Sequence, residues 1–388
     1  MKSKTVLLEA EGLSSSGSER QMYTIAGMKR ILFIIDSLGS GGAQRQSTTI
    51  ASFLKKRGHD VRFVCYASQD FFLPKLHEAN IPVEWILERR PFQRILKIRK
   101  YVRTGGYDVV ISFLHTDNIL NLLSVFGGRK WKVICGERSA KENEFCGKKM
   151  KLEGWLMRFA DVLVCNSENA REMWMKYYPK YKDKYKVIYN SVQLGEKKSD
   201  YKPLKDGKCH VAVAASYQYL KNPIGMIEGV NLLDQEEKDR LEVDWYGMQM
   251  TNNRETKAYL ESKELVAKYR LDDVIHLNSE RTNITEIMQN ADAVALFSWV
   301  EGLPNCICEG MMLGKPIIMT RVSDYGVLID DNNGFHCDWD KPQTICDAFS
   351  ALLRKTKNEL ERMGQVSMER AKELFSEDKV IKKWEDLF

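Results

Sequence analysis

The sequence lacks any apolar run long enough to cross a membrane. Unbroken apolar runs such as ILFII at residues 31–35 are far shorter than the roughly 20 residues that a membrane-spanning helix needs. The first residues also lack a basic start, an apolar stretch and a small-residue cleavage site, so we expect no secretory signal. These absences favour a cytoplasmic protein.

CxxC pairs are also missing, although the chain contains nine cysteines. The number is odd, and the closest pair, Cys306 and Cys308, would sit at the start of a helix. The pattern therefore indicates reduced, mostly buried thiols, as in a cytosolic protein, rather than a disulfide framework.

Two kinds of ligand have little support. The loop DSLGSGGAQRQS at residues 36–47 is not GxGxxG, and the next strand lacks a ribose-binding acid, so we expect no nicotinamide or other cofactor. Aromatic stacking platforms and nucleic-acid recognition modules are absent, which argues against a nucleic-acid partner. The loop's glycines suit close approach of an anion to the helix that begins at Ala43, although an ordinary tight turn explains them equally well.

Charge is distributed unevenly along the chain. The formal net charge is +6, but residues 28–190 hold 30 lysines and arginines against 16 acidic residues, whereas residues 191–388 hold 26 against 34. Such a difference predicts two domains that face different partners. With 388 residues, 44% of them hydrophobic, the chain is long enough for two sizeable cores.

Short apolar strands alternate with amphipathic helices in both halves, which predicts two parallel sheets covered by helices. Strands are expected at 30–36, 61–66, 83–86, 108–114, 131–135, 161–165 and 186–189, and again at 209–216, 241–247, 273–278, 291–297 and 315–320. Helices are expected between them, including 43–57, 92–104, 253–269 and 305–313.

The domain boundaries follow from this alternation. Residues 1–27 are polar and of low complexity, and we expect a disordered or artefactual extension. An N-terminal domain at 28–190 and a polar linker at 191–208 come next. A C-terminal domain then spans 209–375, and a helix at 376–388 could pack back on the N-terminal domain.

Two glutamates lie eight residues apart in FSWVEGLPNCICEGMMLGKPIIM at residues 297–319. Glu301 follows a strand, Pro304 and Asn305 begin a helix, and Glu309 falls one turn later on the side of Asn305. One carboxylate could bind sugar hydroxyls and the other a ribose, with a phosphate at the helix start. A capping acid and a solvated glutamate are the alternative, but the apolar surroundings favour a ligand site.

Two further positions are candidates on weaker grounds. Lys221 precedes Asn222, a good N-cap, and Pro223, a good first helical residue, so it could hold a phosphate at a helix mouth. A solvated surface lysine is the alternative. His115 follows a strand in SFLHTDN, where a lone histidine is more often structural.

These residues together resemble a known family. The run Glu301-Gly302-Leu303-Pro304-Asn305 with Glu309 resembles the E-x7-E signature of family four retaining glycosyltransferases. GGAQR at residues 41–45 is similar to the family's glycine turn, VIYNSVQ at 187–193 to its interdomain crossover, and DNNGFHCD at 331–338 to the segment after its last donor loop. The resemblance covers about residues 28–388. It implies the GT-B fold, which is two Rossmann-like doubly wound domains with the active site in the cleft.

The resemblance also implies roles for individual residues. Glu309 would bind the ribose of the donor, Glu301 the hydroxyls of the transferred sugar, and Lys221 the diphosphate. The other implied contacts are those of His115 with the donor sugar, of Gly42 with the diphosphate or acceptor, and of Gly302, Leu303, Pro304 and Asn305 with the sugar and phosphates.

One departure from the family concerns the diphosphate. Members commonly carry an arginine five residues before the lysine, where this chain has Ser216, so Arg138 or Arg281 could supply the missing cation. Asp338-Trp339-Asp340 spells the Asp-x-Asp of metal-dependent glycosyltransferases of the other fold. We interpret it as a surface turn and expect no metal.

A basic amphipathic segment, ERRPFQRILKIRKYVRTGGYD at residues 88–108, has two interpretations of equal weight. It could lie on an anionic membrane, or it could pack its apolar stripe on the sheet as an ordinary surface helix. The positive charge of this half favours a lipid-linked or otherwise anionic acceptor, and a peripheral position at the inner face of the cell membrane.

The sequence therefore predicts a metal-independent retaining glycosyltransferase. It would move a hexose or N-acetylhexosamine from a nucleotide sugar, most simply a UDP-sugar, to a lipid-linked or oligosaccharide acceptor of a surface polysaccharide such as capsule or lipopolysaccharide. A GT-B-fold nucleotide-sugar epimerase and a non-catalytic sugar-nucleotide-binding module remain alternatives. A hydrolase with two carboxylates flanking the bond is not excluded by spacing in the sequence.

Overall fold

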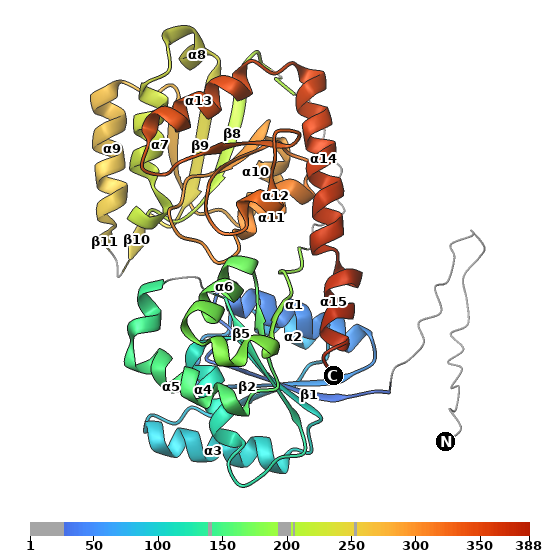
Figure 1. Cartoon of the computed structure of the whole chain (residues 1–388). Helices are drawn as coiled ribbons and strands as arrows, with labels where there is room; N and C mark the ends of the chain where they lie inside the picture. The colour runs from blue at the N-terminus through green and yellow to red at the C-terminus, as the bar shows by residue number, and fades with distance from the viewer. Residues whose placement is uncertain (1–26, 139–141, 193–202, 205, 252–253) are drawn as a thin grey trace, which may run out of the picture.

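The computed structural model describes residues 27–138, 142–192, 203–204, 206–251 and 254–388. Two parallel sheets, each covered by helices, lie one above the other in Figure 1. This arrangement confirms the predicted pair of doubly wound domains. The expected extension at 1–27 lies almost wholly outside the described residues, as does most of the linker expected at 191–208.

The N-terminal sheet has seven strands in the order β3-β2-β1-β4-β5-β6-β7. Because β1 is central, its residues alternate between two buried faces, with Phe33 on one and Ile34 on the other. The order reverses between β1 and β4, and the loops after these strands face a crevice. The strands are β1 Arg30–Ile35, β2 Asp60–Cys65, β3 Val83–Trp85, β4 Val109–Ser112, β5 Lys132–Glu137, β6 Val162–Cys165 and β7 Tyr185–Val187.

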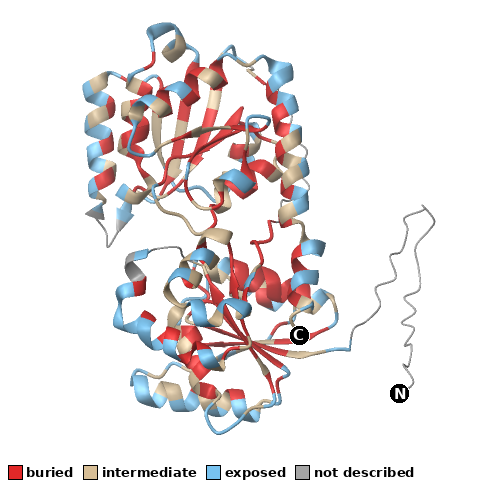
Figure 2. Cartoon of the chain, viewed as in Figure 1, coloured by how far each residue is buried: buried red, intermediate tan, exposed pale blue. Residues whose placement is uncertain are grey.

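Helices cover both faces of this sheet. Residues of α1 and α2 pack with Phe33, whereas residues of α3, α4, α5 and α6 pack with Ile34. The helices are α1 Gly42–Lys56, α2 Leu73–Glu78, α3 Pro91–Thr104, α4 His115–Ser124, α5 Lys148–Leu156 and α6 Glu168–Tyr177. Figure 2 shows the buried strands between helices whose outer sides are exposed.

The C-terminal sheet has six strands in the order β12-β9-β8-β13-β14-β15. They are β8 Cys209–Ala214, β9 Leu241–Gly247, β12 Ile275–Ser279, β13 Ala293–Leu296, β14 Ile317–Thr320 and β15 Gly334–Cys337. Around them lie α7 Pro223–Asn231, α8 Gln235–Asp239, α9 Lys257–Tyr269, α10 Ile284–Asn290, α11 Asn305–Met312, α12 Tyr325–Leu328, α13 Pro342–Leu353 and α14 Lys357–Phe375. The helix predicted at 253–269 begins later, because a short hairpin of β10 Met250–Thr251 and β11 Arg254–Glu255 precedes it.

The last helix, α15 Glu377–Glu385, returns to the N-terminal domain (Figure 1). Trp384 is fully buried there and stacks on Phe113 at 5.9 Å, and Asp378 pairs with Arg57 at 2.8 Å. The chain thus crosses between the domains twice, near residue 191 and near residue 376. The backbone N–H of Val192 donates to the carbonyl of Phe375 at 3.3 Å, so the two crossings lie side by side.

Candidate active site

A cavity of about 400 Å³ lies between the two domains. The N-terminal domain supplies most of its wall, from the start of α1 and the loops after β4, β5 and β6. Loop residue Leu303 and the first residue of α11, Asn305, close it from the C-terminal domain. Its lining is Gly42, Ala43, Gln44, Gln46, Phe113, Leu114, His115, Glu137, Arg138, Asn166, Asn190, Leu303 and Asn305. The structure therefore brings together four of the predicted site residues, Gly42, His115, Leu303 and Asn305.

The two domains approach each other at backbone distance beside this cavity. A β-carbon added at Gly302 would lie 2.7 Å from the carbonyl oxygen of Arg138, closer than real β-carbons come to other atoms. At Gly42 an added β-carbon would lie 3.6 Å from Asn305 Nδ2. Glycine at 302 is thus required by contact with the other domain.

The N-terminus of α11 is held at the cavity by the N-terminal domain. Pro304 occupies the N-cap position, and Asn305 Oδ1 accepts a hydrogen bond from Asn190 Nδ2 at 2.8 Å. Asn190 Oδ1 in turn accepts from the guanidinium of Arg138 at 3.2 Å. The unsatisfied N–H groups of a helix start favour negative charge, so this end of α11 suits a phosphate.

Glu301 and Lys221 form an ion pair on the C-terminal domain. Lys221 Nζ lies 2.5 Å from Glu301 Oε1, which also accepts from Ser298 Oγ at 2.7 Å. The side chain of Asn222 accepts from the N–H of Gly225 at 3.2 Å, so the predicted cap of α7 is confirmed. The pair uses Oε1 of Glu301, whereas its Oε2 and the other N–H groups of Lys221 take no part in this contact.

Glu309 is almost completely buried and pairs across the domain interface. Its Oε1 lies 2.8 Å from the guanidinium of Arg45, which belongs to α1. Burial raises the pKa of Glu309, and Arg45 opposes this rise. Arg45 was not among the predicted site residues, although it ends the segment at residues 41–45 that carries part of the resemblance. A ribose at Glu309 would compete with Arg45.

His115 is oriented by a fully buried carboxylate. Its Nδ1 lies 2.8 Å from Oε2 of Glu153 on α5, and Glu153 Oε1 accepts from Asn118 Nδ2 at 2.7 Å. A carboxylate can only accept here, so Nδ1 carries the proton and the ring is fixed against the cavity that His115 lines. Glu153 was not among the predicted site residues, because α5 is far from His115 in the chain.

The two arginines considered for the diphosphate differ in position. Arg138 lines the cavity, whereas Arg281 is exposed after β12 and is not part of the lining. In the Asp-Trp-Asp segment, Asp338 pairs with Arg321 at 2.6 Å and with Lys341 at 2.9 Å, and Trp339 is 40% exposed. That geometry is a surface turn whose first carboxylate is neutralised.

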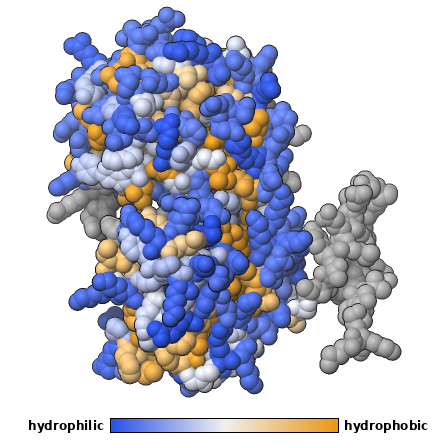
Figure 3. All heavy atoms as spheres, viewed as in Figure 1, coloured by the Kyte–Doolittle hydropathy of each residue, from blue (hydrophilic) through white to orange (hydrophobic). Residues whose placement is uncertain are grey.

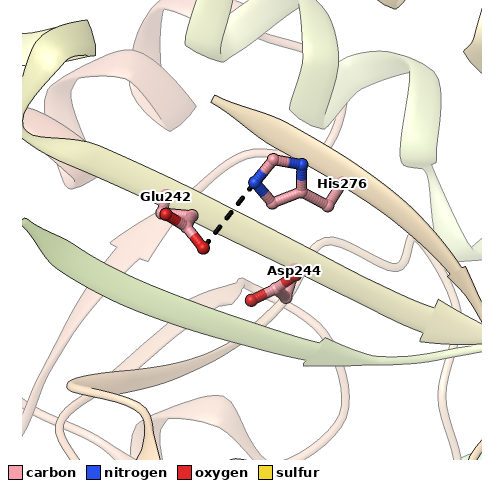
Figure 4. A group of neighbouring side chains, drawn as sticks. All are labelled: Glu242, Asp244 and His276. Carbon is pink, nitrogen blue, oxygen red and sulfur yellow. Dashed lines mark ion pairs between the residues drawn. The ribbon is translucent and has the colours of Figure 1, made fainter. Parts of the chain in front are cut away.

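One other cluster could hold a cation on chemical grounds. Figure 4 shows Glu242 and Asp244 of β9 beside His276 of β12, with donor atoms within 4.8 Å of one another. Glu242 already pairs with His276 and His210, each at 3.6 Å. The cluster lies at the beginning of its strands, whereas the loops that reach the cavity leave the opposite, carboxyl ends. It is separate from the interdomain site.

Comparisons with known proteins agree with this architecture. The family described as Glycosyltransferase Family 4 matches residues 40–196, and Glycosyl transferases group 1 matches residues 196–370. The chain is a GT-B glycosyltransferase. Together the two matches span nearly the whole described part of the glycosyltransferase. No curated protein matches its sequence.

Solved structures share the glycosyltransferase's fold at low sequence identity. HepE from Anabaena in complex with UDP superimposes with a TM-score of 0.80 at 17% identity, covering 92% of this chain and 98% of its own. A glycosyltransferase from Rickettsia africae gives 0.73 at 16% identity, covering 93% and 97%. The lipopolysaccharide outer core galactosyltransferase WaaB gives 0.72 at 13% identity, covering 92% and 98%.

Proposed function

We propose that this glycosyltransferase transfers a hexose or N-acetylhexosamine, with retention and without a metal, from a UDP-sugar to a lipid-linked or oligosaccharide acceptor. The acceptor would belong to a surface polysaccharide such as capsule or lipopolysaccharide. One observation carries the proposal. Leu303 and Asn305 line a cavity whose remaining wall is N-terminal, and they lie in the chain between Glu301, which pairs with Lys221, and Glu309, which pairs with Arg45 of α1.

The proposed donor contacts follow from the chemistry of each group. Glu309 accepts hydrogen bonds from the ribose hydroxyls, and Glu301 accepts from hydroxyls of the transferred sugar. The start of α11 and Lys221 face the diphosphate, whose negative charge grows as the anomeric C–O bond breaks. The structural neighbour HepE is known in complexes with UDP and with UDP-glucose, which supports the choice of nucleotide.

Group transfer then needs only the acceptor's hydroxyl. Its oxygen forms a bond to the anomeric carbon on the face that the leaving diphosphate vacates, and its proton passes to the departing diphosphate oxygen. No protein base is required. The buried carboxylate of Glu153 would hold the imidazole of the partly exposed His115 toward the donor sugar. Transfer that persists after EDTA treatment would support metal independence, whereas lost transfer restored by added Mg²⁺ or Mn²⁺ would refute it.

The deciding experiment separates the two glutamates. Glu309→Ala should weaken UDP binding by about 10- to 150-fold, because a hydrogen bond to a charged group contributes roughly 1.5–3 kcal/mol. Glu301→Ala should leave UDP affinity nearly intact while transfer falls by about 100-fold or more. Calorimetric titration of UDP measures the first effect and product formation the second, with circular dichroism to verify folding.

Several outcomes would reject this assignment. If both variants bind UDP and transfer sugar like the parent, the carboxylates are structural. If UDP-sugar is converted without any acceptor, the protein is an epimerase rather than a transferase. Arg45→Ala provides a matched control. It removes the partner of Glu309 but leaves the carboxylate available to the ribose, so UDP affinity should not fall.

We also propose that α3 attaches the enzyme to an anionic membrane surface. Ile98 and Val102 are buried against the sheet, but Phe92 and Leu96 are 70% and 49% exposed. Figure 3 shows apolar surface among charged side chains on the N-terminal domain. Among the described residues, every helix is too short or too polar to cross a membrane.

Vesicle binding tests this surface. Binding to anionic vesicles should exceed binding to neutral ones, weaken with salt, and fall when Phe92 and Leu96 are both changed to alanine. Leu260→Ala, at an exposed position of the C-terminal domain, is the control. Equal binding to neutral and anionic vesicles at low salt would contradict the proposal.

A further inference from the structure

The N-terminal wall of the cavity holds buried polar atoms with unused hydrogen-bonding capacity. Gln46 and Asn166 are 4% and 3% exposed, and Gln46 Oε1 and Asn166 Oδ1 accept no hydrogen bond from any described residue. Arg138 Nε and one of its terminal nitrogens likewise donate to no described residue. A buried polar atom without a partner is costly, so several in one cavity point to a ligand that satisfies them.

Arg138 stands out because no described carboxylate forms an ion pair with it. Its guanidinium lies over the ring of Phe113 at 4.4 Å and near that of Trp384 at 5.9 Å, which fixes its position. The neighbouring Glu137 directs Oε2 to Trp174 Nε1 at 2.8 Å. Burial lowers the pKa of Arg138 to about 10, so it is still charged at neutral pH.

The unsatisfied atoms define the ligand's chemistry. A guanidinium with open N–H groups binds phosphate or carboxylate oxygens, with phosphate favoured by its geometry and charge. Amide oxygens such as those of Gln46 and Asn166 accept hydrogen bonds from hydroxyls. A ligand that combines a phosphate with neighbouring hydroxyls is a sugar phosphate.

The position of these atoms assigns the ligand to the acceptor side. Gln46 lies on α1, Arg138 follows β5 and Asn166 follows β6, so all three belong to the N-terminal domain. The groups proposed for the donor's ribose and diphosphate, Glu309, Lys221 and the start of α11, belong to the C-terminal domain, and of the N-terminal residues only His115 is proposed to face the donor sugar. We propose that Arg138, Gln46 and Asn166 form the acceptor subsite, and that they recognise a phosphate group attached to the acceptor sugar. This inference rests on the transferase function proposed above.

The first experiment uses the full-length protein saturated with UDP. Calorimetric titration with glucose 1-phosphate should show binding, and methyl α-glucoside at the same concentration should bind at least tenfold more weakly. Arg138→Met keeps an apolar stem over Phe113 and should reduce glucose 1-phosphate affinity by about tenfold or more, with UDP affinity unchanged. Arg281→Met, which removes an exposed arginine outside the cavity, should change neither affinity.

The outcomes separate this inference from the proposed function. Failure of the parent to bind UDP rejects the proposed donor site, and glucose 1-phosphate is then titrated alone. Loss of UDP affinity in Arg138→Met overturns the inference, because Arg138 would then serve the donor. Parent-like binding of glucose 1-phosphate by Arg138→Met, or an equal loss in Arg281→Met, also overturns it. A melting curve identifies an unfolded variant, and Asn166→Ala then replaces it with a smaller expected loss in the same assay.

A lipid-linked probe distinguishes the source of the phosphate. Glucose joined through phosphate to a short prenyl chain carries the same group as glucose 1-phosphate. Arg138→Met should therefore lose the same factor in affinity for both probes. If the lipid-linked probe binds Arg138→Met as well as the parent, its affinity comes from the chain and the phosphate subsite is refuted.

Discussion

The two domains share one architecture, but the polar groups that they present to the cleft differ in whether they already have partners within the protein. On the C-terminal side the charged groups are paired, Glu301 with Lys221 and Glu309 with Arg45. On the N-terminal side Arg138, Gln46 and Asn166 retain unused donors and acceptors. With the proposed roles, a donor would exchange some of these contacts for new ones, whereas an acceptor would add contacts that the described residues do not make. The comparison predicts that one wall binds and releases a nucleotide and that the other selects the acceptor.

The largest expected effect is on the free energy of unfolding, and it tests whether α15 belongs to the N-terminal domain. Trp384 follows the whole C-terminal domain in sequence, yet it is buried against Phe113. Trp384→Ala should reduce the free energy of unfolding by about 3–5 kcal/mol, because it leaves a large cavity in the N-terminal core. Thermal melting with a domain-specific fluorescence probe measures this loss. Destabilisation confined to the C-terminal domain would contradict the assignment of α15.

A smaller effect tests the contact between the domains. Gly302→Ala places a β-carbon against the carbonyl of Arg138, and such overpacking typically costs about 1–3 kcal/mol. The cost arises only when the cleft is closed, so transfer should slow by roughly 5- to 150-fold while the melting temperature changes little. Gly326→Ala is the control, because an added β-carbon there meets no atom within 4 Å. Equal rates in both variants would show that the domains work further apart.

The smallest effect concerns pH. Burial raises the pKa of Glu309 above its usual 4.5, so its protonated form contributes stability below 4.5 that is lost as pH rises through the raised value. Protonation of Glu309 also reduces its capacity to accept hydrogen bonds from the ribose hydroxyls. UDP affinity should therefore fall by a few-fold between pH 7 and the raised pKa. Titrations of the parent and Glu309→Gln across this range isolate the carboxylate from the phosphate's own titration. Parallel pH profiles would exclude Glu309 as the cause.

Sequence patterns predicted the sheets well because central strands such as β1, β4 and β13 are continuous or nearly continuous apolar runs, and β9 alternates regularly between buried and partly exposed residues. β15 was missed because GFHC is short and polar in part, and α14 was not predicted as a separate helix, although the domain boundary expected at residue 375 coincides with its end. The helix predicted at 253–269 started too early in the prediction, because the β10–β11 hairpin that precedes α9 has no hydrophobic alternation.

The residues of the candidate site also fall into those that local sequence predicts and those that it does not. Residues within one loop, such as Pro304 and Asn305, follow from local helix-start chemistry. Partners from distant segments, such as Arg45 for Glu309 and Glu153 for His115, depend on tertiary packing that spacing in one sequence does not reveal. Arg138 was considered only as a substitute cation for the diphosphate. Its lack of a carboxylate partner among the described residues became visible only with the cavity.

The return of α15 has a consequence for synthesis on the ribosome. Val380, Ile381 and Trp384 complete the core face that Phe33 and Phe113 begin, but they are translated last. At about 5–20 residues per second, the first domain waits for roughly tens of seconds while the second is made. During that wait α1 and α2 cover part of this apolar face, but the area that α15 covers stays exposed in the nascent chain. The first domain to emerge is therefore the last to finish folding, and a ribosome that stops before residue 377 releases a chain with both sheets but an open core.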